Sequence, residues 1–307
     1  TVSSITSTTA DGTYKQGDAV AITVTFSEAV TVTGTPQLTL ETGTSDALVN
    51  YSSGSGDATI IFSYTVATGE TSSDLDYGST TALALNSGTI TDVAGNAATL
   101  TLVEPGATNS LGADKALVID GVVPTVSSVT STTADGTYNP GDIIVITVTF
   151  SEAVTVDTTN GKPQLTLETG TTDAVVDYSS GSGERTLIFN YTVATGDTSS
   201  DLKYTSTEAL ALNNGTIVDG AGNAAILTLA EPGASNSISM DKALILDTSL
   251  PTIAAVTSTA ANGNYKLDDT IPITITFTEA VTVNTDNGTP TLTLETGTTD
   301  AVVNYVS

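Results

Sequence analysis

Apolar and polar residues alternate along several short stretches of the chain. Val20, Ile22, Val24 and Phe26 fall on one side of an extended backbone, with small or polar residues between them. A period of two is typical of a β-strand that buries one face. Turn-forming residues separate these stretches, and helical periodicity is almost absent. We therefore predict an all-β protein.

The first part of the chain contains enough alternating stretches for a complete domain. We predict seven strands there, at residues 2–6, 20–26, 37–40, 47–51, 60–66, 83–90 and 116–119, and an extra strand at 99–103. Seven short strands joined by turns are typical of an immunoglobulin-like β-sandwich.

One seven-residue pattern occurs three times along the chain. It reads VTFSEAV at residues 24–30 and 148–154, and ITFTEAV at 275–281. The spacings of its glutamate are 124 and 127 residues, between Glu28, Glu152 and Glu279. Repetition at this period predicts tandem domains in a linear array. We expect repeats at 1–121 and 122–248, and the N-terminal part of a third at 249–307.

Composition limits the possible functions. The chain has 34 acidic and 7 basic residues and a net charge of −27, which argues against binding to nucleic acid or anionic membrane surfaces. It has no Cys and no His, which excludes thiolate and imidazole chemistry. No apolar run is long enough to span a membrane. We expect a non-catalytic protein, and because Thr1 is already in phase with the repeat, a segment of a longer one.

Strand parity predicts where some acidic side chains lie. Glu28 lies two residues after the inward-facing Phe26 and Asp92 two residues after Ile90, so in an extended strand each acid points to the same face as that apolar residue. With alternating strand directions, both acids fall at the end of the domain where the preceding linker arrives. The linker residue Asp120 should then approach the equivalent acids of the second repeat, Glu152 and Asp219, together with Asn223. By the same reasoning, Asp247 should approach Glu279 of the third repeat.

Converging carboxylates repel one another unless a cation lies between them. Carboxylate and amide oxygens are the ligands that Ca²⁺ prefers, so we predict Ca²⁺ at the joints between repeats. The candidate ligands are Glu28, Asp92, Asn96, Asp120, Glu152, Asp219, Asn223, Asp247 and Glu279. An alternative stays open: the aspartates could form Asx turns, with Gly95 and Gly222 at positive φ, and the glutamates could be solvated.

Several motifs together resemble those of a known group of repeats. They are TADGTY, VTFSEAV, PQLTLETG, YSSGSG, the DxAGNA motif and the closing ALVID. This set is similar to the tandem Ig-like and cadherin-like repeats of very large bacterial surface adhesins and biofilm-associated proteins. The resemblance implies an extracellular stalk on a bacterial cell surface, with calcium at the joints in many relatives.

Three functions are compatible with these observations. The first is a spacer, whose partners are the neighbouring repeats of the same chain. The second is a subunit of a self-assembling extracellular filament, sheath or surface layer, whose partners are other copies. The third is a module that binds glycan or protein, although no aromatic cluster supports it. Paired carboxylates also occur in glycosidases, but these lie at strand ends without an aromatic-lined cleft.

Overall fold

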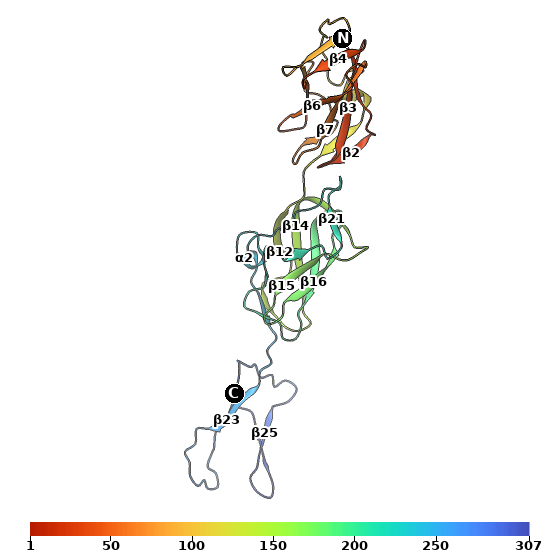
Figure 1. Ribbon diagram of the computed structural model, residues 1–307. Coiled ribbons are helices and arrows are strands. Elements are labelled where there is room, and N and C mark those ends of the chain that lie inside the picture. The colour runs from red at the N-terminus through yellow and green to blue at the C-terminus, as the bar shows by residue number, and fades with distance from the viewer. Residues whose placement is uncertain (307) are drawn as a thin grey trace. The chain divides into compact units, whose positions relative to one another are not determined.

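The computed structural model describes residues 1–306, and β-strands form nearly all of its regular structure (Figure 1). The all-β prediction is therefore confirmed. The chain divides into two compact units, residues 1–247 and 248–307. The first unit holds two separate hydrophobic cores. We call residues 1–121, around the first core, module 1, and residues 122–247, around the second, module 2.

Module 1 consists of strands and one short helix. These are β1 (Val2–Ser7), β2 (Gly12–Lys15), β3 (Ala19–Phe26), β4 (Val30–Thr33), β5 (Gln37–Leu40), β6 (Ala47–Ser53), β7 (Thr59–Thr65), β8 (Thr71–Ser72), β9 (Leu83–Ala84), β10 (Thr89–Asp92), α1 (Leu111–Asp114) and β11 (Leu117–Asp120). The largest sheet has the order β1-β3-β7-β6-β5-β9, a second has β2-β11-β8, and β4 pairs with β10.

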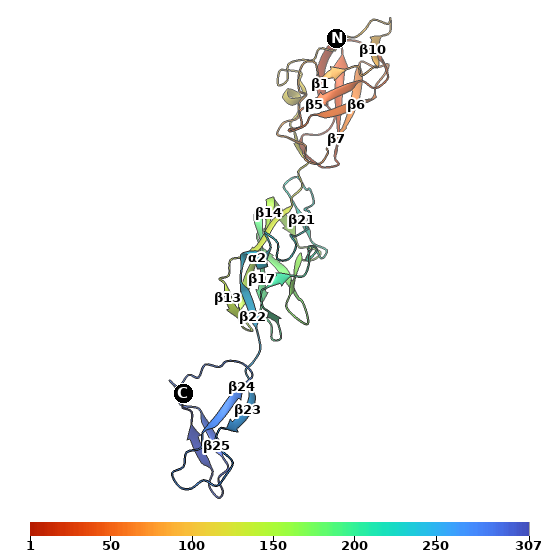
Figure 2. The same ribbon diagram turned by 90° about the vertical axis from the view of Figure 1, so that its left-hand side faces the viewer.

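Module 2 repeats this arrangement. It contains β12 (Val126–Ser131), β13 (Gly136–Tyr138), β14 (Ile143–Asp157), β15 (Gln164–Glu168), β16 (Ala174–Ser180), β17 (Glu184–Thr192), β18 (Thr198–Ser199), β19 (Lys203–Tyr204), β20 (Leu210–Ala211), β21 (Thr216–Val218), α2 (Ile238–Asp241) and β22 (Leu244–Asp247). The larger sheet has the order β12-β14-β17-β16-β15-β19, with β20 on β15 and β21 on β14, and the smaller has β13-β22-β18. Figure 2 shows β13 beside its partner β22.

Each core draws its residues from more than one sheet of its module. In module 1, Ile22 and Val24 of the larger sheet share one buried cluster with Leu117 and Ile119 of the smaller sheet. The inward residues are those that the alternation predicts, because successive side chains of a strand point to opposite faces. Burial of these aliphatic side chains stabilises each module by about 1.5–3 kcal/mol per side chain.

The two modules differ where the repeated glutamate lies. In module 1, β3 ends at Phe26 and β4 begins at Val30, so Glu28 lies between two strands. In module 2, one strand, β14, runs through the equivalent Glu152. Its pairing with β17 shifts register between Thr149 and Val154, as at a β-bulge. The glutamate therefore lies inside an irregular strand and does not end it.

Two predicted strands are wrong. The strand at 83–90 is broken into β9 and β10, because Asn86 and Ser87 have φ of 45° and 63° and turn the chain between them. Residues 99–103 form no strand. Leu102 is buried there, but the segment is held by its backbone N–H to Thr80 O and by the buried Tyr77, whose hydroxyl donates to Val103 O at 2.8 Å.

The second unit contains two separate hairpins. β23 (Ile253–Ser258) pairs with β24 (Ile273–Phe277), and β25 (Thr291–Leu294) pairs with β26 (Ala301–Asn304). The first hairpin has the same register as β1 and β3, with Ile253 opposite Phe277 as Val2 is opposite Phe26. Among its described residues, large apolar side chains such as Val256 and Ile275 are exposed.

Two neighbouring glycines in the β16–β17 turn give a test of local packing. Both have positive φ, +105° at Gly181 and +89° at Gly183. A Cβ at Gly181 would lie 2.2 Å from Thr186 O, whereas one at Gly183 has open space. We expect Gly183→Ala to cost about 1–2 kcal/mol of unfolding free energy for its backbone conformation alone, and Gly181→Ala to cost clearly more. Urea unfolding measures both, and equal losses would contradict the close approach.

Candidate metal centre

Three carboxylates from two modules lie close together in the first unit. Asp120 ends β11 of module 1, Glu152 lies in β14 of module 2, and Asp219 follows β21. One oxygen from each lies within 4.8 Å of the others. The predicted proximity of these three side chains is therefore observed, and their binding of a cation stays a prediction. We call these three residues the carboxylate cluster.

Backbone pairing positions the cluster. β14 and β21 are antiparallel neighbours with Thr155 opposite Val218, which places Glu152 and Asp219 at the same end of the module. The linker that follows Asp120 is held against this end. Ser151 N donates to Thr125 O at 2.8 Å, and Ile226 N donates to Pro124 O at 2.8 Å. Asp120 therefore lies at the cluster because the linker after it is hydrogen-bonded to two separate segments of module 2, at Ser151 and at Ile226.

Asp219 is held by its own turn. Its Oδ1 accepts backbone N–H groups from Ala221 at 2.9 Å, Gly222 at 2.7 Å and Asn223 at 2.8 Å. This is the Asx-turn chemistry of the alternative interpretation, and Gly222 has the positive φ of +92° that it requires. The turn does not remove Asp219 from the cluster, because it fixes a buried carboxylate in place beside Glu152.

Glu152 is the least satisfied member of the cluster. Its Oε1 is buried and has no hydrogen-bond partner among the described residues. Burial raises the pKa of its carboxyl, and the negative charges of Asp219 and Asp120 raise it further, against a smaller opposing effect of Arg185. A buried polar atom without a partner is uncommon and calls for an explanation. A hard cation held by these oxygens would supply the missing partner and remove the repulsion.

The raised pKa of Glu152 predicts a pH effect on stability without divalent cations. In the unfolded chain this carboxyl titrates near 4.5, and in the folded protein it takes its proton at higher pH. As the pH falls through the raised value, only the folded state gains the proton, so Glu152 makes folding more favourable down to about 4.5. We expect thermal melts in EDTA to show this gain: as the pH falls, the stability of the wild type should rise relative to that of Glu152→Gln. A difference that is constant with pH would contradict it.

Asn223 lies beside the cluster and contacts both modules. Its Nδ2 donates to Asp120 O and to Asp219 Oδ2, both at 2.8 Å, and its Oδ1 accepts the N–H of Gln16 at 2.9 Å. Lys15 Nζ donates to Gly222 O at 2.9 Å. Neither Lys15 nor Gln16 is among the residues that the sequence predicts at this site. The scarcity of basic residues in the chain could have drawn attention to Lys15.

The equivalent residues of module 1 form no such cluster. Glu28 is exposed, and within residues 1–306 it joins no close group of three carboxylates. Asp92 forms the same Asx turn with Asn96, and the Asn96 side chain holds the pKa of Asp92 below its usual value. Asp247 ends β22 of the first unit and Glu279 follows β24 of the second, so their proximity stays a prediction.

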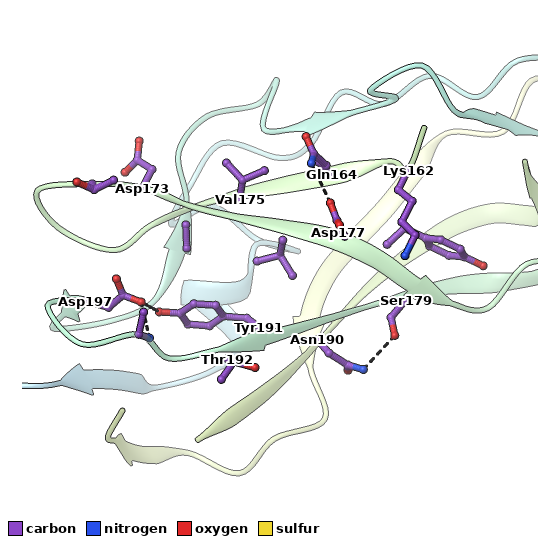
Figure 3. A pocket seen from close by; sticks show the side chains of 15 residues that line it. Lys162, Gln164, Asp173, Val175, Asp177, Ser179, Asn190, Tyr191, Thr192 and Asp197 are labelled. Carbon is purple, nitrogen blue, oxygen red and sulfur yellow. Dashed lines mark hydrogen bonds between the residues drawn. The ribbon is translucent and has the colours of Figure 1, made fainter. Parts of the chain in front are cut away.

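One groove lies on the outer face of β15, β16 and β17 (Figure 3). Its polar side chains largely bond one another: Gln164 Nε2 donates to Asp177 Oδ1 at 2.8 Å, and Asn190 Nδ2 donates to Ser179 Oγ at 3.0 Å. Tyr178 and Tyr191 in its lining are buried and offer no exposed ring to a ligand. The groove therefore has the character of a hydrogen-bonded sheet surface.

Across residues 1–306, no helix is both long and apolar enough to cross a membrane. Comparisons of the chain with protein-family models and with curated proteins find no match.

Proposed function

We propose that the chain is a non-catalytic repeat region of a secreted bacterial surface protein, which acts as a calcium-stiffened spacer in cell adhesion or biofilm formation. The carboxylate cluster carries this proposal, because its ligand atoms come from two modules. In this proposal each module is an Ig-like sandwich, and the modules follow one another in a linear array. The matching strand registers of β1–β3 and β12–β14 support a tandem repeat.

A cation at the cluster would act on the joint between modules. Ca²⁺ accepts six to eight oxygen ligands in flexible geometry, and carboxylates can bind it through one or both oxygens. An ion held by Asp120, Glu152 and Asp219 would tie the end of module 1 to β14 and to the turn after β21 in module 2. Rotation about the linker would then require ligands to leave the ion. The joint would be stiffer with calcium than without it.

The extracellular location fits the chemistry of the site. Extracellular calcium modules bind with dissociation constants of roughly 10⁻⁴ to 10⁻³ M, which suits an environment rich in calcium. A net charge of −27 keeps such a chain soluble and disfavours contact with anionic surfaces. The partners in this proposal are the neighbouring repeats of the same chain.

Calorimetric titration of the whole chain with calcium tests the proposal. We expect binding in the range of roughly 10⁻⁴ to 10⁻³ M, with weaker binding of magnesium. At 10 mM calcium and a dissociation constant of 1 mM, module 2, which supplies two of the three carboxylates, should gain about 1.4 kcal/mol in unfolding free energy. No heat of binding and no change in melting temperature up to tens of millimolar would contradict calcium at this joint.

The second candidate is a subunit of a self-assembling filament, sheath or surface layer. The exposed apolar residues of the second unit favour it, because unpaired strands with apolar side chains readily pair with other chains. Sedimentation velocity over a range of concentrations separates the two functions. A spacer stays monomeric, whereas a subunit forms larger species as the concentration rises.

A further inference from the structure

We infer that Asn223 links the two modules without any metal, and that its contact is specific for the Lys15–Gln16 loop of module 1. This inference does not depend on the proposed calcium function. It concerns which module ends can join and what holds them when no cation is present.

The side-chain amide of Asn223 forms hydrogen bonds through both its oxygen and its nitrogen. Asn223 as a whole residue is 3% exposed. The backbone N–H of Gln16 can only donate, so the atom that faces it at 2.9 Å must be the amide oxygen. The Nδ2 group then donates to Asp219 Oδ2 in module 2 and to Asp120 O at the end of β11 in module 1. One buried side chain therefore bonds its own turn and two places in the preceding module.

The module 1 side of this contact is held by its own strands. β2 and β11 are parallel neighbours with Lys15 opposite Asp120, so the donor loop and the Asp120 carbonyl lie side by side. Lys15 N donates to Asp18 Oδ2 at 3.0 Å, and Gly17 N donates to Val66 O at 2.9 Å. The loop is thereby fixed before it meets Asn223. Lys15 Nζ adds a charged donor to Gly222 O, and hydrogen bonds from charged donors are the stronger ones.

The corresponding loop of module 2 cannot make the same contact. Asn139 and Pro140 replace Lys15 and Gln16. Its backbone is otherwise held alike, with Asn139 N donating to Asp142 Oδ2 at 2.8 Å and Gly141 N donating to Val193 O at 2.9 Å. Proline has no N–H to donate, and asparagine lacks the reach and charge of lysine. The end of module 2 that contains Pro140 therefore has no backbone N–H at this position to donate to an amide oxygen placed like that of Asn223.

Module 1 provides a matched control for the Asn223 turn. Asn96 makes the same bonds to Asp92, from its backbone N at 2.8 Å and from Nδ2 at 2.7 Å. Asn96 is exposed, however, and bonds no second module. Asn223→Ala and Asn96→Ala thus remove the same local turn bond, and only the first also removes the inter-module bonds.

Distance measurements between spin labels test the inference on the whole chain. The protein has no cysteine, so Thr44→Cys and Thr171→Cys place one exposed label on each module. In EDTA, we expect a narrow distance distribution that Asn223→Ala and Gln16→Pro broaden at least twofold. Asn96→Ala and Gln16→Ala, which retain the inter-module bonds, should leave it narrow. Gln16→Pro leaves the Asn223 turn unchanged, and the equivalent loop of module 2 already has proline at this position. It therefore tests the link even if Asn223→Ala disturbs its own turn.

The outcomes separate this inference from the calcium proposal. A broad wild-type distribution in EDTA overturns the metal-independent link, and so does equal broadening by Asn96→Ala and Asn223→Ala. If Gln16→Pro leaves the distribution narrow, the specificity of the link is overturned. Calcium that narrows the Asn223→Ala distribution supports the cluster separately. Calcium that changes no variant contradicts the proposed function and leaves the link standing.

Discussion

Glutamine in place of Glu152 is expected to weaken calcium binding by tenfold or more and, without calcium, to raise the melting temperature of module 2. The substitution removes one carboxylate ligand from a site whose affinity depends on ligand charge, and a tenfold loss corresponds to about 1.4 kcal/mol. In EDTA the same change removes the repulsion by Asp219 and Asp120 from a buried oxygen. A relief of about 1 kcal/mol would raise the melting temperature by roughly 2–4 °C.

Glu28→Gln is the matched control for Glu152→Gln. Glu28 occupies the same place in the repeat but is exposed and joins no carboxylate cluster within the described residues. We expect this variant to change neither calcium affinity nor cation-free stability measurably. The two effects of Glu152→Gln have opposite signs, which a merely structural role would not produce. Loss of stability in EDTA, or unchanged calcium affinity, would count against the carboxylate cluster as a metal centre.

Alanine in place of Phe189 is expected to unfold module 2 at much lower temperature and to leave module 1 folded. Phe189 is 0% exposed, and its ring lies edge-on to Tyr178 with centroids 6.2 Å apart. Loss of a buried phenylalanine costs about 3–5 kcal/mol, because the cavity left behind closes only in part. The corresponding fall in melting temperature is about 10 °C or more. Hydrogen exchange followed by mass spectrometry should show lost protection in residues 122–247.

Phe62→Ala provides the reciprocal variant in module 1. Phe62 is also 0% exposed and lies edge-on to Tyr51 at a centroid distance of 6.4 Å. It should cost a similar free energy and release protection in residues 1–121. The two buried clusters share no residues, which is why we expect two separate transitions. Loss of protection in both modules from either substitution would show that they unfold as one.

The alternating pattern was sufficient to predict β3, because Val20, Ile22, Val24 and Phe26 must share one face once the backbone is extended. It was not sufficient for β2, which lies in a turn-rich segment and becomes a strand by pairing with β11 far along the chain. It also failed at residues 99–103, where the contact that decides the structure is the hydroxyl of Tyr77.

The candidate site shows the same limit. Strand parity and strand direction were sufficient to predict that Asp120, Glu152 and Asp219 meet. They place Glu152 and Asp219 at one end of module 2, and the linker brings Asp120 to that same end. The contribution of Gln16 could not be predicted in this way. It donates through its backbone, so any residue other than proline could serve at this position, and its contact depends on how the two modules are rotated about the linker. Sequence patterns do not encode that rotation directly.

The parallel pairing of β2 with β11 has a consequence for folding during synthesis. Its partners, such as Gly12 and Leu117, are separated by nearly the whole module, which gives the fold a high contact order. A ribosome must therefore release almost all of module 1 before its second sheet can close. The last residue of that pairing is Asp120. Completion of module 1 thus fixes Asp120 in place before Glu152 and Asp219 of module 2, which lie later in the chain, have been synthesised.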